Sequence, residues 1–206
     1  MRKNANLRGR KVNQIELDFQ AQKHLLVASD IHNSEQALEG LAELAKHPNC
    51  LAFLYAGDLN VENYFIGEIL RYRSFVFLPI LGNCDNPWAF ADVNVPTPPY
   101  YRTASYCNAT GKLDIYMSHG HLYPYPTEEM VGEKTFNLII NGHSHVGLLQ
   151  QEDNTIIFNP GSPSQPRGNC IPSYGVILIP PSGAFTVQLR KFGSNALLSQ
   201  KTVPLN

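Results

Sequence analysis

The sequence predicts an α/β (α+β) fold, a four-layer αββα sandwich in which two mixed β-sheets pack face to face between flanking helices. Three observations support this prediction. Apolar runs alternate with helical patterns between residues 24 and 81, hairpin-like segments fill the second half, and polar side chains repeatedly follow the apolar runs. Alternating strands and helices form parallel sheets with right-handed crossovers, and successive hairpins add antiparallel strands.

The composition limits the classes of function. The 206 residues fit one domain, since single cores hold about 100 to 250 residues. Sixteen basic residues balance 17 acidic ones, so we expect no nucleic-acid partner that binds through a broad basic field.

No apolar stretch approaches the length of a membrane-spanning helix, which is about 20 residues, so we expect no membrane partner. Four separated cysteines without a secretory leader favour the cytoplasm. The composition is compatible with a homo-oligomer.

Residues 1–23 are predicted to be an N-terminal extension, and residues 24–206 a single domain. The first 11 residues include five basic ones and no apolar core of a signal peptide. Ile15, Leu17 and Phe19 then alternate with polar neighbours, which predicts an edge strand after a mobile tail. A contact with nucleic acid or lipid is the alternative interpretation of the basic segment.

The first half alternates strands with helices. We predict strands over 24–29, 51–57 and 74–81, and helices over 34–47 and 61–73. The first helix has apolar residues at helical spacing, Asn33 or Ser34 as its cap, and Pro48 just beyond its end.

The second half is expected to consist mainly of loops and hairpins. Past Pro87 a loop rich in proline and tyrosine precedes paired strands within 100–118, 146–159 and 174–192, each centred on turn-forming residues. A short helix is predicted over 127–135, with Thr127 as its N-cap.

Metal-binding side chains follow the apolar runs. They are Asp30, His32, Asp58, Asn83, His119, His143 and His145. If the segment stays extended, Asp30 and His32 lie on the same side and can reach one ion, and His143 and His145 have the same spacing. Gly57 permits a tight turn before Asp58. Each fragment alone is more often a turn or a helix cap.

Five motifs occur together in one order: Asp30-x-His32, Gly57-Asp58, Gly82-Asn83-Cys84-Asp85, His119-Gly120-His121 and Gly142-His143-Ser144-His145. This order resembles the calcineurin-like metallophosphoesterases, and most of all the small YfcE-type phosphodiesterases, which share the later motifs and Asn159-Pro160-Gly161-Ser162. The similarity covers roughly residues 24 to 190, and the two-sheet sandwich of that family agrees with the fold predicted above.

The resemblance implies two divalent metal ions per chain. Manganese is the expected ion, and zinc, iron, nickel or cobalt suit the same oxygen and imidazole donors. One ion would be held by Asp30, His32, Asp58 and His145. The other would be held by Asp58, Asn83, His119 and His143, with Asp58 bridging the two.

The expected activity is hydrolysis of a small phosphodiester. Two divalent ions and two aspartates leave a formal excess of two positive charges, which attracts phosphate. A hydroxide held by the metals would attack phosphorus, because bound water can ionise at a pH near about 7. The alternatives are a phosphomonoesterase that uses the same site, and a metal-binding scaffold for protein interactions with little catalysis.

Three further residues are candidates for catalytic roles: Cys84, His121 and Asp85. Cys84 stands where the wider superfamily has a histidine that contacts phosphate or protonates the leaving group. A thiol is a poorer acid near neutrality, so we expect slow turnover or a need for acidic leaving groups. His121 would contact phosphate or fix its own loop, and Asp85 is expected to orient a histidine. Trp88, Tyr123 and Tyr125 could form a wall for an aromatic leaving group, or simply pack.

Overall fold

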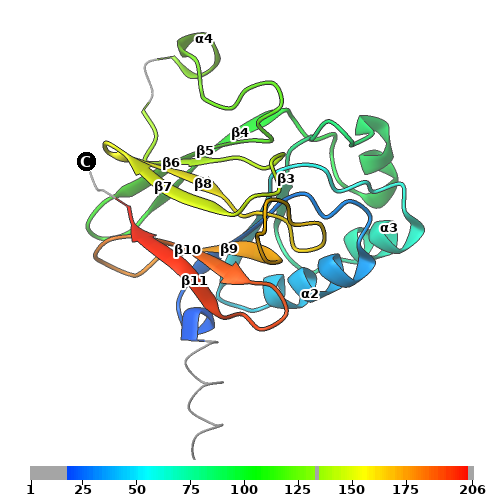
Figure 1. The fold of residues 1–206 in the computed structure, drawn as a ribbon, viewed down its shortest axis with the longest axis horizontal. Helices are drawn as coiled ribbons and strands as arrows, with labels where there is room; N and C mark the ends of the chain where they lie inside the picture. The colour runs from blue at the N-terminus through cyan, green and yellow to red at the C-terminus, as the bar shows by residue number, and fades with distance from the viewer. Residues whose placement is uncertain (1–17, 133–134, 204–206) are drawn as a thin grey trace, which may run out of the picture.

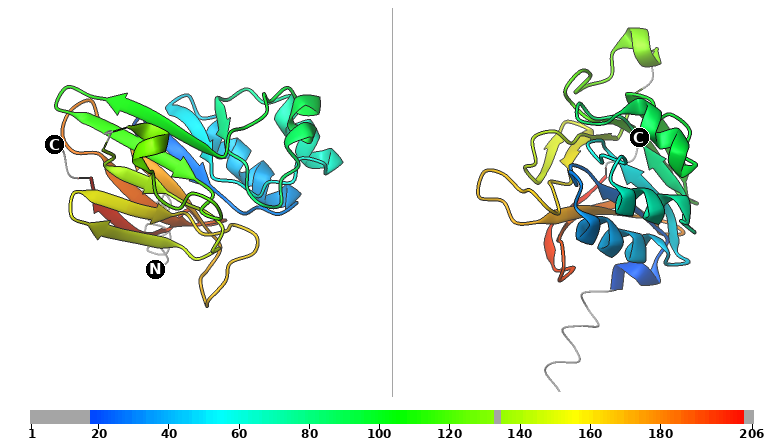
Figure 2. Two further views of the ribbon diagram at one scale, coloured as in Figure 1. Left: turned by 90° about the horizontal axis from the view of Figure 1, so that it is seen from above. Right: turned by 90° about the vertical axis from the view of Figure 1, so that its right-hand side faces the viewer.

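The computed structural model describes residues 18–132 and 135–203, in which two β-sheets face each other (Figures 1 and 2). The first sheet has the order β11-β10-β9-β1-β2-β3. Its strands are β1 (His24–Ala28), β2 (Cys50–Tyr55), β3 (Phe77–Pro79), β9 (Ser173–Leu178), β10 (Thr186–Lys191) and β11 (Leu197–Thr202). The first three are parallel to one another, and β9 to β11 extend the sheet with antiparallel pairs.

The second sheet has the order β4-β5-β6-β8-β7. Its strands are β4 (Tyr101–Cys107), β5 (Lys112–Ser118), β6 (Leu138–Ile140), β7 (Leu148–Glu152) and β8 (Thr155–Asn159). The three central strands are parallel, and β4 and β7 pair antiparallel at the edges. Both sheets are therefore mixed, as the sequence predicts.

Strand β1 shows how the layers are joined. Leu25 and Val27 point into the core between the sheets, where they join side chains of β5, β6 and β8. Leu26 and Ala28 point to the opposite face, into the core beneath α2 (Glu35–Ala45) and α3 (Tyr64–Arg71). Because successive side chains of a strand alternate in direction, a strand buried on both faces is apolar throughout.

The helices are distributed unevenly around the confirmed sandwich. Both α2 and α3 cover the first sheet, and they begin at Ser34 and Asn63, whose side chains accept hydrogen bonds from the first helical turn. Over the second sheet, the part of the chain that the structure describes contains only α4 (Glu128–Val131), which lies away from the strands (Figure 1). Thr127 is its N-cap, without a side-chain hydrogen bond.

Several details differ from the sequence predictions. The expected loop after Pro87 begins with the 3-10 helix η2 (Pro87–Val93), because the Asn86 side chain accepts a hydrogen bond from the Trp88 N–H. Strand β3 is shorter than predicted, and β11 was not predicted. Of the predicted edge strand near the N-terminus, Ile15 and Leu17 lie outside the described residues, and Asp18–Ala21 forms the 3-10 helix η1 instead of an extended segment.

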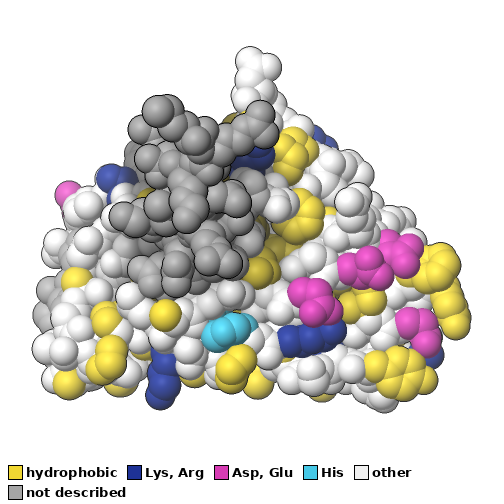
Figure 3. Space-filling model, turned by 90° about the horizontal axis from the view of Figure 1, so that it is seen from below, with side chains coloured by type: hydrophobic (Ala, Val, Ile, Leu, Met, Phe, Trp, Pro, Cys, Tyr) yellow, Lys and Arg dark blue, Asp and Glu magenta, His cyan; other side chains and the backbone are white. Residues whose placement is uncertain are grey.

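The surface beneath α2 carries charges of both signs. Seen from below, Lys and Arg side chains lie among Asp and Glu side chains (Figure 3). Lys46 pairs with Glu43 at 2.5 Å, and Arg71 with Glu68 at 2.6 Å. No helix in the described ranges is both long enough and apolar enough to cross a membrane.

Candidate metal centre

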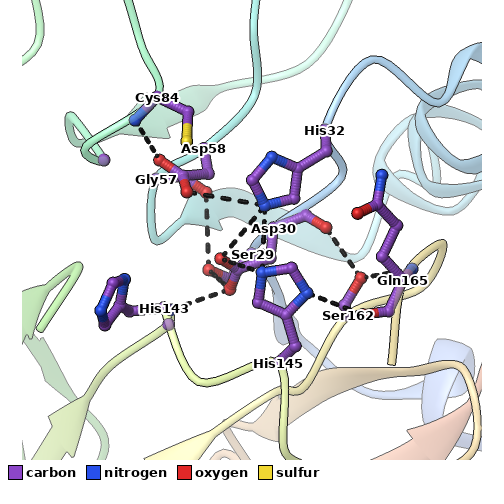
Figure 4. A network of polar contacts seen from close by, with 12 residues as sticks. Ser29, Asp30, His32, Gly57, Asp58, Cys84, His143, His145, Ser162 and Gln165 are labelled. Atoms are coloured by element: carbon purple, nitrogen blue, oxygen red, sulfur yellow. Dashed lines mark hydrogen bonds and ion pairs between the residues drawn. The ribbon is translucent and has the colours of Figure 1, made fainter. Parts of the chain in front are cut away.

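The predicted donor residues come together where the parallel strands of both sheets end. Asp30 and His32 follow β1, Asp58 follows β2, and Asn83 follows β3. His119 follows β5, and His143 and His145 follow β6. The carboxyl ends of parallel strands share one edge of a sheet, so the face-to-face packing brings the two edges together around one site (Figure 4).

The backbone at this edge is not extended, and the expectation for Asp30 and His32 is wrong in this respect. Their φ angles are 58° and 43°, those of His143 and His145 are 66° and 60°, and that of Asp58 is 62°. All five lie in the left-handed region, which non-glycine residues rarely adopt. The two-residue spacing therefore brings Asp30 and His32 together through tight turns. Such strain is concentrated at functional sites.

Two glycines let the turns approach closely. A Cβ atom on Gly82 would lie 2.0 Å from Asp58 Oδ1, and one on Gly142 would lie 1.9 Å from Ser29 Oγ. Gly57 has a φ of 92°, as its predicted place in a tight turn requires. The loops are thus packed backbone against carboxylate, with no room for larger residues.

Two buried aspartates lie at the centre of the site. Asp30 Oδ1 is 3.4 Å from the Nε2 atom of His145, 3.9 Å from that of His32 and 4.0 Å from that of His119. Asp58 Oδ2 is 3.3 Å from His119 Nε2 and 3.6 Å from His32 Nε2. One oxygen of Asp58 therefore lies between histidines that belong to the two predicted ligand sets.

Hydrogen bonds on the far side of the rings orient two of these imidazoles. Nδ1 of His119 is 2.7 Å from the Ala56 carbonyl oxygen, and Nδ1 of His145 is 2.7 Å from the Gln165 carbonyl oxygen. A carbonyl can only accept, so both Nδ1 atoms donate. In the neutral rings, Nε2 is then a bare lone pair directed into the site, as metal-binding histidines require.

The pKa values reflect burial and mutual charge. Burial lowers the pKa of His32 and of His145. Burial would also lower that of His119, but its hydrogen bond to Asp58 and that carboxylate's charge raise it overall. For Asp58, burial is outweighed by the contacts with His119, and the pKa falls. Burial raises the pKa of Asp30.

The donor set fits a cation. Asp30 is fully buried, and its Oδ1 atom has no hydrogen-bond partner within the described ranges. When the Nε2 proton that His119 shares with Asp58 is lost, this nitrogen faces two acceptors, Asp58 Oδ2 and Asn83 Oδ1 at 3.2 Å. Nitrogen and oxygen lone pairs that face one another without a proton between them repel each other. A divalent ion bound among them would accept all of these lone pairs at once. Three close clusters of donor atoms result: Asp30, His32 and His145; Asp30, Asp58 and His119; and His32, Asp58 and Cys84.

Asn83 and His143 lie at the periphery of this set. Both are exposed, and Asn83 reaches the site through its contact with His119. The backbone N–H of His143 donates to Asp30 Oδ2 at 3.0 Å, and its ring lies 5.2 Å from the His119 ring. His143 is absent from the three close clusters of the described residues, although it borders them (Figure 4).

The expectation that Asp85 orients a histidine is not met. Its carboxylate accepts hydrogen bonds of 2.8 to 2.9 Å from four backbone N–H groups, those of Asp58, Leu59, Asn60 and Gly82. A carboxylate has about four acceptor positions, so these bonds occupy it fully. Asp85 therefore fixes the turn that carries Asp58.

Cys84 and His121 lie beside the donor set. The Cys84 N–H donates to Asp58 Oδ1 at 2.8 Å, and burial followed by the charge of Asp58 raises the pKa of the thiol. The His121 ring lies 5.2 Å from that of His119 and 6.2 Å from that of His143. Burial and these two neighbours lower the pKa of His121.

Two serines that support Asp30 were not among the predicted site residues. Ser29 Oγ donates to Asp30 Oδ2 at 2.5 Å, and Ser162 Oγ donates to the Asp30 carbonyl at 2.7 Å. Ser162 belongs to a motif that carries the family resemblance, so its role could have been sought there. Ser29 is an unremarkable residue at a strand end, with no pattern to distinguish it.

The two-sheet sandwich with carboxylate and imidazole donors at the strand ends defines a candidate metallohydrolase. A family model of the calcineurin-like phosphoesterase superfamily domain matches residues 24–179, and the chain belongs to this superfamily. Its members are metallophosphoesterases, and divalent ions are the cofactors of the family.

Relatives and solved structures agree with this assignment. Phosphodiesterase YfcE of Escherichia coli is 28% identical over 165 residues, which cover 74% of this chain and 86% of that protein. Probable metallophosphoesterase YsnB of Bacillus subtilis is 25% identical over 166 residues, 76% of this chain and 84% of that protein. The E. coli YfcE structure has a TM-score of 0.69 at 22% identity and covers 87% of this chain and 99% of that chain. Chaetomium thermophilum Vps29 has a TM-score of 0.62 at 16% identity and covers 89% and 99%. The two structural matches show the shared fold.

Proposed function

We propose that the chain is a phosphodiesterase that depends on two divalent metal ions and hydrolyses a small phosphodiester. The observation that supports this most strongly is the unpartnered, fully buried Oδ1 of Asp30, with three imidazole Nε2 atoms within 4.0 Å. The name of the E. coli relative, a phosphodiesterase, supports the diester as the substrate class.

The proposed ligand sets are those that the resemblance implies. Asp30, His32, Asp58 and His145 would hold one ion, and Asp58, Asn83, His119 and His143 the other. When bound, divalent ions such as Mn²⁺ would supply activation of water and neutralisation of phosphate charge. The protein's part is to hold the donors: Ser29 and Ser162 fix Asp30, Asp85 fixes Asp58, and carbonyls fix the rings of His119 and His145.

The site offers no strong proton donor for the leaving group among Cys84 and His121. In the metal-free chain, burial and the charge of Asp58 raise the pKa of the Cys84 thiol, and a thiol is a poorer acid near neutrality than an imidazolium. Burial and the charges of His119 and His143 lower the pKa of His121, which disfavours its imidazolium form as a proton donor. We therefore expect turnover to depend steeply on the leaving group, and esters of acidic phenols to react fastest.

The diesterase assignment is tested with bis-p-nitrophenyl phosphate and p-nitrophenyl phosphate in added manganese. The diester should react faster, and faster turnover of the monoester would favour a phosphomonoesterase at the same donors.

The role of Asp58 is tested by Asp58→Asn. Asn tolerates the left-handed backbone at this position, so the fold should persist. We expect metal-dependent turnover to fall at least about a hundredfold, because the proposed bridging charge is lost. The matched control is Asp153→Asn, a change of the same chemistry in the exposed turn between β7 and β8, where the backbone is also left-handed. Unchanged hydrolysis by Asp58→Asn would point to another site or to a contaminant.

A further inference from the structure

A cavity of about 430 Å³ lies beside the metal centre, on the side of His143. Its walls come from the loop after β5, the loop after β6, the start of β7 and the end of β8. The apolar part of the lining is formed by Pro124, Tyr125, Val146, Leu148, Ile157 and Phe158. A cavity of this size is in the range that holds small organic ligands.

The pocket adjoins the proposed metal ligands. Gly142 and His143 line it, and the same two residues touch the donor set, since the His143 N–H donates to Asp30 Oδ2 and Gly142 packs against Ser29 and Asp30. A phosphate at the metals would therefore have one ester substituent within reach of the pocket.

The two asparagine side chains of the pocket are already engaged. Asn159 Nδ2 donates to the Gly142 carbonyl and to Ser144 Oγ, and Asn141 Nδ2 donates to Ser118 Oγ and to the Pro124 carbonyl. No Asp, Glu, Lys or Arg is among its described lining residues. A charged substituent would lose its water there without meeting a side chain of opposite formal charge among Asp, Glu, Lys and Arg, whereas an apolar one would gain by leaving water.

The wall over the pocket is held in place. Tyr116 Oη and Ser118 Oγ both donate to the Tyr123 carbonyl, and Asn141 holds Pro124. Tyr125 and Leu148 are nevertheless 51% and 41% exposed. Exposed apolar side chains on a fixed wall present a surface that a ligand can cover without first ordering the loop.

A second cavity of about 470 Å³ lies on the other side, along α3 and η2, and its chemistry differs. Three carboxylates line it, those of Glu62, Glu68 and Asp92, against one guanidinium, that of Arg71, which is already paired with Glu68. Trp88 lines it as well. Carboxylates near an anionic diester are unfavourable, so the pocket at His143 is the better match for an uncharged ring. Trp88 and Tyr125 thus line separate cavities and do not form one wall.

We propose that the pocket at His143 is a specificity subsite that binds an aromatic ester substituent of the phosphodiester. The inference rests on the proposed function, because the phosphate must lie at the metals for the substituent to enter. Leu148 and Tyr125 are the residues that would set the preference for an aryl over a methyl group.

The test is binding of two non-hydrolysable probes, phenylphosphonate and methylphosphonate, to the manganese-loaded full chain by calorimetry. The phenyl compound should bind about tenfold more tightly or better, since the ring leaves water for an apolar pocket. Leu148→Gln should reduce that ratio about threefold or more and leave the affinity for methylphosphonate unchanged. The matched control is Leu197→Gln, because Leu197 is similarly exposed, at 47%, and lies outside the pocket.

Equal affinity of the two probes for the wild-type chain, or no binding of either, would overturn the inference without any variant being needed. The two proposals fail separately. Tight binding of phenylphosphonate without hydrolysis of bis-p-nitrophenyl phosphate would contradict the proposed function alone, and hydrolysis without a preference for phenyl would contradict the subsite alone.

Discussion

At the residue scale, the site depends on how its carboxylates are divided between binding and support. Asp30 and Asp58 each direct one carboxylate oxygen toward the imidazoles, whereas both oxygens of Asp85 accept hydrogen bonds from backbone N–H groups. Three acidic residues at similar strand ends thus have different roles, because each oxygen can serve either a cation or the backbone.

Asp85→Asn should destabilise the protein and weaken metal binding, although Asp85 is not itself a proposed metal ligand. The amide of Asn keeps one oxygen for two of the four N–H groups and turns its NH2 group toward the other two, so two backbone donors lose their partners. We expect a loss of about 2 to 4 kcal/mol in the free energy of unfolding, measured in urea. Manganese affinity should fall about tenfold or more, as for supports of other metal ligands.

The control is again Asp153→Asn, which makes the same change in a solvent-exposed turn. If Asp85→Asn kept wild-type stability and manganese affinity, the support role assigned to Asp85 would be wrong.

The sequence predicted seven donor residues at the strand ends but could not specify their backbone conformation. The order of the motifs predicted metal-ligand roles for Asp30, His32 and Asp58. The prediction of an extended Asp30–His32 segment was wrong, because no local pattern encodes the left-handed turns seen there. These turns exist because distant groups hold them: His32 N–H donates to the Asp58 carbonyl, and Asp30 N–H to that of Gly57. Only the assembled site contains this information.

At the element scale, the beginning of β1 carries a buried histidine outside the metal centre. His24 is fully buried, its Nδ1 lies 2.8 Å from the Gln22 carbonyl, and its Nε2 has no partner within the described ranges. Burial lowers its pKa, and the charges of the nearby His47 and Arg190 act in the same direction. A proton on this ring is therefore unfavourable in the folded state.

The stability of the metal-free protein should consequently decrease as the pH falls below the ordinary histidine value of 6.5. The unfolded chain takes up a proton there, and the folded chain does not until its lower pKa is reached. His24 would contribute up to about 1.4 kcal/mol per pH unit in this window, and nothing above it. His24→Gln removes the contribution, so its unfolding free energy should depend less steeply on pH between 6.5 and 5. Parallel profiles for the variant and the wild type would refute this assignment.

Element prediction succeeded where one pattern dominates. The helix at 35–45 has both a capping serine and helical apolar spacing, and the hairpins have clear turn residues. It failed for β11, whose residues 197–202 are mostly exposed and show no apolar alternation. That strand exists because the edge of β10 offers it a ladder of hydrogen bonds, a tertiary cause that the local sequence does not display.

At the scale of the whole molecule, the proposed centre joins the two sheets. Asp30, His32 and Asp58 follow strands of the first sheet, and His119, His143 and His145 follow strands of the second. Ions bound between them would link two layers that are otherwise held by their shared apolar core. The architecture and the clustering of the donors were predictable together, because face-to-face sheets were the simplest arrangement that brought all the motifs to one edge.

The most direct test of this account is anomalous diffraction at the manganese edge from crystals grown with manganese. We expect two peaks per chain. One should be bounded by Asp30, His32, Asp58 and His145, and the other by Asp58, Asn83, His119 and His143, with Asp58 touching both. A single peak would contradict the dinuclear centre, and no peak among these residues would contradict the metal-dependent mechanism as a whole.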